Sequence, residues 1–136
     1  GEKLIASGRG GATTTALKNK YTTDFLAAKA KYTVLQIGSN DSLSLTVATF
    51  KMNLLELIGR VEENGSIPVL VTIPRRYDTD NTAFITEANA WIKSLGYWYI
   101  DEYALLPADR LLNDTIHPNA EGHDLILSNL LALIPV

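Results

Sequence analysis

The 136-residue sequence contains no cysteine, and this absence excludes several kinds of site. Without a thiol, the chain cannot form disulfides, bind a metal through thiolates or use a cysteine nucleophile. Long apolar runs are also absent, since none approaches the roughly 20 residues that a membrane-spanning helix needs. These absences do not identify a localisation, because reducing and oxidising compartments both permit a cysteine-free chain.

Positive charge is scarce and scattered. Twelve Lys and Arg residues stand against fifteen Asp and Glu, giving a net charge of −3. No basic face is visible that would neutralise phosphates, which argues against a nucleic-acid partner. The 46% hydrophobic and 20% charged content is ordinary for a globular protein. The length favours one domain over residues 1–136.

Hydrophobic periodicity predicts strands alternating with helices. Apolar, β-rich runs predict strands at residues 3–7, 32–37, 68–74 and 97–100. Helical spacing predicts helices at residues 14–20, 24–29, 46–63, 84–95 and 119–133, with Ile126, Leu130 and Leu133 facing inward. Residues 39–42 are expected to form a turn, and residues 101–112 a loop with one helical turn. This alternation implies a three-layer α/β/α fold around a parallel sheet.

Three polar segments follow the predicted strands or precede the last helix: Gly8–Ala12, Gly38–Ser42 and Asp114–His117. Ligands in parallel α/β folds bind beyond the carboxyl ends of the strands. We therefore expect all three segments to meet at one edge of the sheet.

Asp114 and His117 have the composition of an acid–base pair. Residues three apart can be neighbours in a helical or turn-like segment, so the carboxylate can hold one imidazole nitrogen and leave the other free. Such a histidine can accept a proton from a nucleophile, and the acid can stabilise the imidazolium that forms. The alternative is a surface acid beside a histidine at a helix start.

Asn40 and Gly11 are candidate oxyanion donors. An Asn side-chain amide just after a buried strand can donate to a developing oxyanion, and so can a glycine backbone N–H. The alternatives are an ordinary polar turn at Asn40 and, at Gly11, a strand-to-helix turn that needs positive φ.

These segments together resemble the SGNH hydrolases, also called GDSL esterases and lipases. Gly10-Gly11-Ala12-Thr13-Thr14 is similar to the second family block, with Gly11 at the oxyanion glycine. Gly38-Ser39-Asn40-Asp41 is similar to the third, with Asn40 at the oxyanion asparagine. Asp114-Thr115-Ile116-His117 resembles the fifth, which supplies the acid and the base. The resemblance implies a flavodoxin-like sheet.

One family block is missing. The Gly-Asp-Ser that would carry the nucleophile is absent, and Leu4–Ser7 resembles the second family strand, so a first strand and first helix are expected to be missing. In the family order 2-1-3-4-5 the missing strand lies between the second and third. Without that strand Leu4–Ser7 would lack a partner. We therefore expect a companion chain, a cleaved or lost N-terminal segment, or a strand exchanged in a dimer to fill the gap. The non-Met start at Gly1 fits a cut precursor.

The remaining candidate residues give weaker indications of a functional role. His123 is expected on the last helix with no recognisable zinc spacing, and no metal or cofactor is implied. The glycines at positions 8, 10 and 11 lack the remaining features of a phosphate-binding loop. Arg75 and Arg76 could touch an anionic or sugar substrate, although a solvated loop is the simpler interpretation. Either Trp98 or Tyr99 could line a surface.

The sequence thus predicts an ester hydrolase, with carbohydrate acetyl groups as one candidate substrate. The isolated chain is expected to be nearly inactive without its serine. Two alternatives are also compatible with the sequence. The domain could be a non-catalytic binding or structural module on a hydrolase scaffold, or, more remotely, a nucleotide-binding flavodoxin-like protein.

Overall fold

The computed structural model describes residues 4–7, 13–24, 31–75, 81–105 and 120–133. The strands are β1 (Leu4–Ser7), β2 (Tyr32–Leu35), β3 (Ile67–Val71) and β4 (Trp98–Ile100). The helices are α1 (Thr14–Asp24), α2 (Asp41–Ser44), α3 (Val47–Glu63), α4 (Thr82–Ser94), α5 (Glu102–Leu105) and α6 (Ala120–Leu133). All four predicted strands are confirmed, at slightly shorter lengths.

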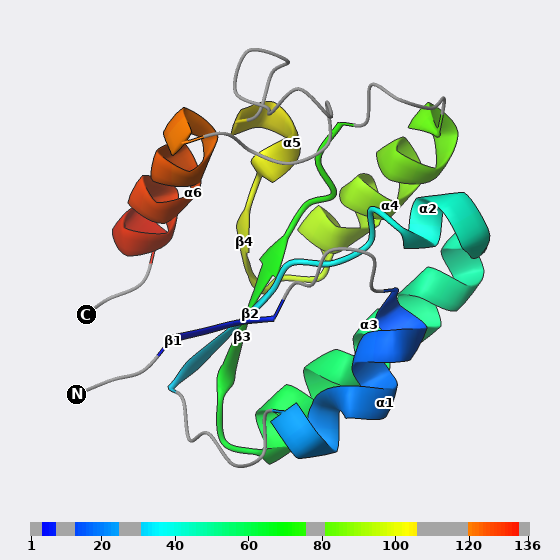
Figure 1. Cartoon of the computed structure of the whole chain (residues 1–136), viewed down its shortest axis with the longest axis horizontal. Helices are drawn as coiled ribbons and strands as arrows, with labels where there is room; N and C mark the ends of the chain where they lie inside the picture. Colours follow the sequence, from blue (N-terminus) through cyan, green and yellow to red (C-terminus); the bar gives the residue numbers. More distant parts are fainter. Residues whose placement is uncertain (1–3, 8–12, 25–30, 76–80, 106–119, 134–136) are drawn as a thin grey trace.

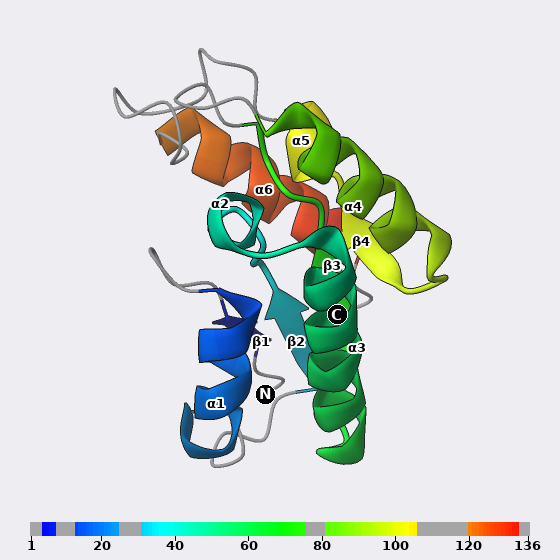
Figure 2. The same ribbon diagram turned by 90° about the vertical axis from the view of Figure 1, so that its right-hand side faces the viewer.

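The described strands form one parallel sheet in the order β1-β2-β3-β4. Helices α1, α3 and α4 lie on one side of the sheet, and α6 lies on the other (Figure 1). Figure 2 shows α1 and α3 running alongside one another on their side. The predicted three-layer α/β/α arrangement is therefore confirmed.

Strand β1 does not lack a partner. It pairs with β2 along its whole length, from Leu4 opposite Tyr32 to Ser7 opposite Leu35. The expectation of a gap beside Leu4–Ser7 is thus wrong. Backbone N–H and C=O groups buried without partners are costly, and direct pairing of β1 with β2 removes that cost.

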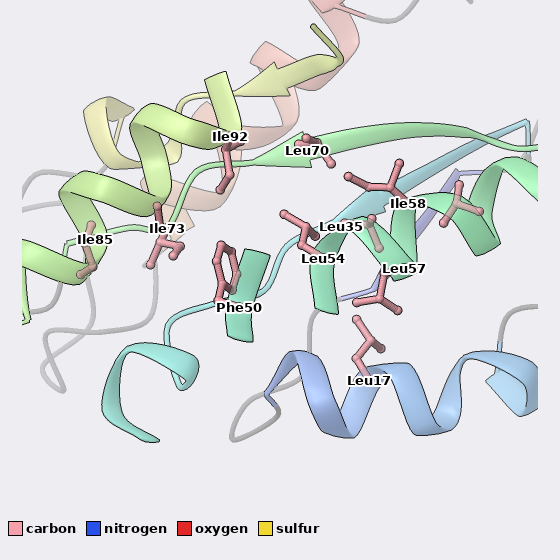
Figure 3. Packing of buried hydrophobic residues seen from close by; sticks show 12 residues of the cluster. Leu17, Leu35, Phe50, Leu54, Leu57, Ile58, Leu70, Ile73, Ile85 and Ile92 are labelled. Carbon is pink, nitrogen blue, oxygen red and sulfur yellow. The ribbon is translucent and has the colours of Figure 1, made fainter. Parts of the chain in front are cut away.

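The larger core lies between the sheet and helices α1, α3 and α4 (Figure 3). Phe50 of α3 is fully buried there and meets the Trp91 ring of α4 edge-on, with centroids 6.2 Å apart. The helical spacing on α3 predicts its buried face correctly, since Leu54, Ile58 and Val61 are all buried. Burying each such side chain contributes about 1.5–3 kcal/mol.

A smaller core lies on the α6 side of the sheet. Its buried members are Tyr32, Val34, Val69, Val71 and Ile100. Leu130 and Leu133 of α6 pack against them, which confirms the predicted inward face for these two residues, while the Ile126 side chain lies outside the described set. Strand β3 contributes to both cores, as its continuous apolar run predicts.

Two helices differ from the sequence-based expectation. Helix α1 runs on to Asp24, and the rest of the second helical piece expected at residues 24–29 lies outside the described ranges. The expected turn at residues 39–42 is confirmed at residues 39 and 40, while Asp41 and Ser42 instead begin α2, a four-residue helix. The backbone N–H of Ser42 donates to Gly38 O at 3.1 Å and that of Leu43 to Asn40 O at 3.1 Å, which closes a helical turn.

Candidate active site

Of the four predicted site residues, the structure describes Asn40. Gly11, Asp114 and His117 lie outside the described ranges, and their roles stay predictions. Asn40 stands between the carboxyl end of β2 and the start of α2, at the edge where parallel α/β folds bind ligands. The hydrogen bonds and packing around Asn40 therefore belong to the candidate site.

Gly38 determines the path of the loop that carries Asn40. Its φ is +130°, in a region that favours glycine. A Cβ atom added here would lie 2.7 Å from Ile73 Cδ1 and 3.0 Å from Phe50 Cε2, so the loop is pressed against the larger core. The first residue of the Gly38-Ser39-Asn40-Asp41 motif is thus required both by conformation and by space.

The serines beside Asn40 serve the loop itself. The Ser42 hydroxyl donates to Ser39 O at 2.6 Å and accepts a hydrogen bond from Asn81 Nδ2. The Ser44 hydroxyl donates to Asn40 O at 3.3 Å. These bonds fasten the loop to its own helix and to the residue that precedes α4. They give Ser42 and Ser44 structural roles.

Asp41 joins this loop to the start of α1. Its side chain is fully buried and accepts two hydrogen bonds from Thr14: one from the backbone N–H, at 2.9 Å, and one from the hydroxyl. Asn53 of α3 supports the junction, because its Nδ2 donates to the Thr14 hydroxyl at 3.1 Å and to that of Thr15 at 3.0 Å. The Lys18 ammonium in turn donates to Asn53 Oδ1 at 3.2 Å.

Burial raises the pKa of Asp41 above its ordinary value, and the hydrogen bonds from Thr14 oppose that rise. The carboxyl group is therefore held in a dry environment by donors that favour its charged form.

A second buried acid lies just beyond strand β4. Glu102, the first residue of α5, is 1% exposed, and its Oε2 accepts a hydrogen bond from Gln36 Nε2 at 2.8 Å. Burial raises the pKa of Glu102 to about 7, and the bond from Gln36 acts against that rise. Glu102 lies two residues beyond the carboxyl end of β4, and Gln36 directly follows that of β2, so this pair belongs to the same edge of the sheet as Asn40.

Asp101 and Thr72 connect the ends of β3 and β4. The Thr72 hydroxyl donates to Asp101 Oδ1 at 3.0 Å and accepts from the Tyr103 backbone N–H at 3.0 Å. Asp101 Oδ1 also accepts from the Ala104 N–H at 3.3 Å, which caps α5. This network holds the first turn of α5, and with it Glu102, in place.

Within the described ranges, no group of three or more His, Asp or Glu side chains is placed to hold a metal ion. Nor is any helix of that part long and apolar enough to cross a bilayer. Arg75, a candidate substrate contact, lies with its guanidinium 4.5 Å from the centre of the Tyr103 ring. Trp98 and Tyr99 are each 38% exposed, so both reach the surface.

A model of the GDSL-like lipase/acylhydrolase family matches residues 1–125. The chain belongs to this family. The comparison with curated proteins found no match.

Solved structures share the GDSL-like fold at low sequence identity. A putative lipolytic protein of the G-D-S-L family from Desulfitobacterium hafniense superposes with a TM-score of 0.80 at 21% identity, over 90% of this chain and 76% of that one. An acetylxylan esterase from Geobacillus stearothermophilus gives a TM-score of 0.77 at 18% identity, over 93% and 69% of the two chains. An α/β hydrolase from the metagenome of Lake Arreo gives 0.76 at 21% identity, over 90% and 68%.

Several residues at this edge were not singled out from the sequence. Asp41 and Thr14 stand inside the two family blocks, but no local pattern indicates that they bond across 27 positions. Glu102 and Gln36 carry no motif at all. A glutamate two residues after a strand end is the one signal that could have suggested a buried acid.

Proposed function

We propose that this chain supplies the acid, the base and two oxyanion donors of a serine ester hydrolase. In this proposal His117 is the general base, and Asp114 orients it. Asn40 and the backbone N–H of Gly11 donate hydrogen bonds to the oxyanion. The proposal extends the family assignment, which supports hydrolysis of esters, to named residues of this chain.

The reaction has two halves. The serine hydroxyl attacks the ester carbonyl while His117 takes its proton, and the tetrahedral oxyanion is stabilised by the Asn40 amide and the Gly11 N–H. The intermediate collapses to an acyl-enzyme when His117 returns the proton to the leaving alkoxide. Water then attacks the acyl-enzyme, again with His117 as base, and releases the acid. Asp114 stabilises the imidazolium in both halves.

One observation carries this proposal. The Asn40 loop and the segment entering α1, which belong to two separate family blocks, are joined by the contact of Asp41 with Thr14. A binding module on the same scaffold has no evident need for that junction. An oxyanion site needs it, because donors from two loops must converge on one oxygen atom.

The nucleophilic serine is proposed to come from a segment or chain outside these 136 residues. The sequence contains no Gly-Asp-Ser, and the hydroxyls of Ser42 and Ser44 are engaged in the α2 loop. Without its serine the isolated chain is expected to be nearly inactive, since removing the nucleophile of a serine hydrolase costs on the order of a million-fold in kcat.

The substrate class is an ester of a small acyl group. Acetyl groups on a carbohydrate are the favoured example, because one structural neighbour is an acetylxylan esterase.

The test is hydrolysis of an activated acetate ester by the native protein, complete with any companion polypeptide. His117→Ala is expected to lower kcat on the order of 10⁴-fold or more, while a surface variant, Lys93→Ala, leaves it unchanged. Full turnover by His117→Ala would contradict the assigned base. Serine-dependent turnover by the 136-residue chain alone would contradict the external nucleophile.

A further inference from the structure

We infer that Asp41, Thr14 and Asn53 form a positioning device that holds the Asn40 loop in register with the segment entering α1. This inference rests on the proposed function, in which both segments supply oxyanion donors. None of the three residues is assigned contact with substrate. They act through Asn40 and through the chain that leads into Thr14.

The device is built from buried polar groups on three elements. Asp41 belongs to α2, Thr14 to α1 and Asn53 to α3, and their side chains are 0%, 0% and 2% exposed. No element carries the contact alone, because the partners stand 27 and 39 positions apart in the sequence. A buried network in which every member is bonded defines one geometry.

Each donor in the device has an acceptor. Both carboxylate oxygens of Asp41 are occupied, one by the Thr14 N–H and the other by its hydroxyl. The same hydroxyl oxygen accepts from Asn53 Nδ2, so its proton is directed toward Asp41. Among the described side chains, no buried polar atom is left unpaired. The orientation of Thr14 is therefore determined from two sides.

The position of the Asn40 loop depends on the contact between Asp41 and Thr14. Asp41 directly follows Asn40, and the turn that contains both is closed by the Ser42 and Leu43 N–H groups. On the opposite side Gly38 is pressed against Ile73 and Phe50. Since the core blocks movement of Gly38, losing the bond to Thr14 leaves the Asp41 end of the loop free to shift. A displacement of about 1 Å in a catalytic group can cost on the order of 100-fold in rate.

The kinetic test uses the native protein and three variants. Asp41→Ala is expected to lower kcat on the order of 100-fold with KM unchanged, because an oxyanion donor acts in the transition state. Asp41→Asn retains an oxygen that accepts from the Thr14 N–H and should recover kcat to within about 5-fold of the parent. Thr33→Val is the matched control for a lost buried bond, since it removes a 3%-exposed hydroxyl whose oxygen lies 2.7 Å from Ser66 Oγ.

Two kinetic outcomes would overturn the inference. One is an Asp41→Ala enzyme with parental kcat. The other is a loss that Thr33→Val reproduces, because the effect would then follow stability and not the position of the loop.

A second readout does not depend on turnover. Amide hydrogen exchange in isotope-labelled native protein reports on Ser42 and Leu43, whose N–H groups close the turn around Asn40. Thr14→Val, which lies outside this turn, should speed exchange at both amides by about 10-fold or more relative to Thr33→Val. Equal exchange in the two variants would overturn the positioning device. If the native protein hydrolyses no ester, the proposed function fails, and the exchange result alone decides whether the device exists.

Discussion

Two buried carboxyl groups, those of Asp41 and Glu102, lie at the same edge of the sheet and differ in the hydrogen bonds that they accept. Asp41 is bonded twice by Thr14, once by a backbone N–H and once by a hydroxyl. Glu102 accepts one side-chain bond, from the neutral amide of Gln36. Burial raises both pKa values, and it raises that of Glu102 to about 7. Two hydrogen bonds from Thr14 oppose the rise at Asp41, and one from Gln36 opposes it at Glu102.

This difference distinguishes a rigid region around Asp41 from a titratable region around Glu102. Around Asp41, hydrogen bonds and close packing at Gly38 leave little room for another geometry. Around Glu102, the contact survives in either protonation state, since a protonated or an ionised oxygen can accept from Gln36. We therefore expect substitutions to be costly in the first region and pH to matter in the second.

The largest effect is expected at Gly38 in the rigid region. Gly38→Ala adds a methyl group 2.7 Å from Ile73 Cδ1 at a φ of +130°. Backbone strain and overpacking together should lower the free energy of unfolding by about 4 kcal/mol. Urea denaturation measures this loss. Gly65→Ala is the control, because its φ is also positive, at +77°, but no atom lies within 4 Å of the added carbon, and about 1 kcal/mol is expected. Equal losses would show that packing at Gly38 is unimportant.

The next largest effect is expected for Asp41→Ala, which should lower the free energy of unfolding by about 3 kcal/mol. The substitution leaves the buried N–H and hydroxyl of Thr14 without their acceptor, and each unsatisfied donor costs about 1–3 kcal/mol. Asp41→Asn should cost roughly 1 kcal/mol, because one acceptor oxygen remains. Urea denaturation of both variants at pH 7 checks the order. An Asn variant as unstable as the Ala variant would contradict the hydrogen-bond account.

In the titratable region, stability should depend on pH through Glu102. Its pKa rises on folding from the ordinary 4.5 to about 7, so the native state binds the proton more tightly than the unfolded state. The contribution is therefore fully present below pH 4.5 and is lost as the pH rises toward and through 7. The loss amounts to about 3 kcal/mol at 1.36 kcal/mol for each pKa unit.

Glu102→Gln isolates that contribution. The variant should match the parent near pH 4 and exceed its stability by about 3 kcal/mol near pH 8, where the parent carries a buried charge. Denaturant midpoints measured at the two pH values give the comparison. Parallel pH profiles of stability for parent and variant would show that a group other than Glu102 causes the pH dependence.

The smallest effect is expected at the rim of the titratable region. Lys93 lies 3.5 Å from Asp101 with both side chains partly exposed, so Lys93→Ala should cost no more than about 0.5 kcal/mol. Asp101→Ala should cost about 1–2 kcal/mol, because it removes the α5 cap and the partner of Thr72. Thermal unfolding resolves the two losses, and a larger effect for Lys93→Ala would reverse this assignment.

The strands and long helices were predictable because their signals are local. The run at β3 is apolar throughout and is buried on both faces, and the spacing of Phe50, Leu54, Ile58 and Val61 matches one face of α3. Helix α2 was not predictable, because Asn40, Asp41 and Ser42 favour turns as readily as a single helical turn.

The contacts that define the candidate site depend on distant partners, which a sequence pattern does not report. Asp41 meets Thr14 across 27 positions and Glu102 meets Gln36 across 66. The pairing of β1 with β2 is likewise a property of the folded sheet, and family strand order alone led to the wrong expectation. The Asn40 motif was visible because its chemistry is carried by four consecutive residues.

The central claim is that this chain carries the base and oxyanion donors while the attacking serine lies on a different segment. Treating the native protein with a fluorophosphonate, which labels activated serines covalently, and then weighing every polypeptide in the sample tests it directly. The account predicts one added phosphonyl group on a serine outside these 136 residues, lost in His117→Ala. A phosphonyl group on a serine of the chain itself, such as Ser39 or Ser42, would contradict it.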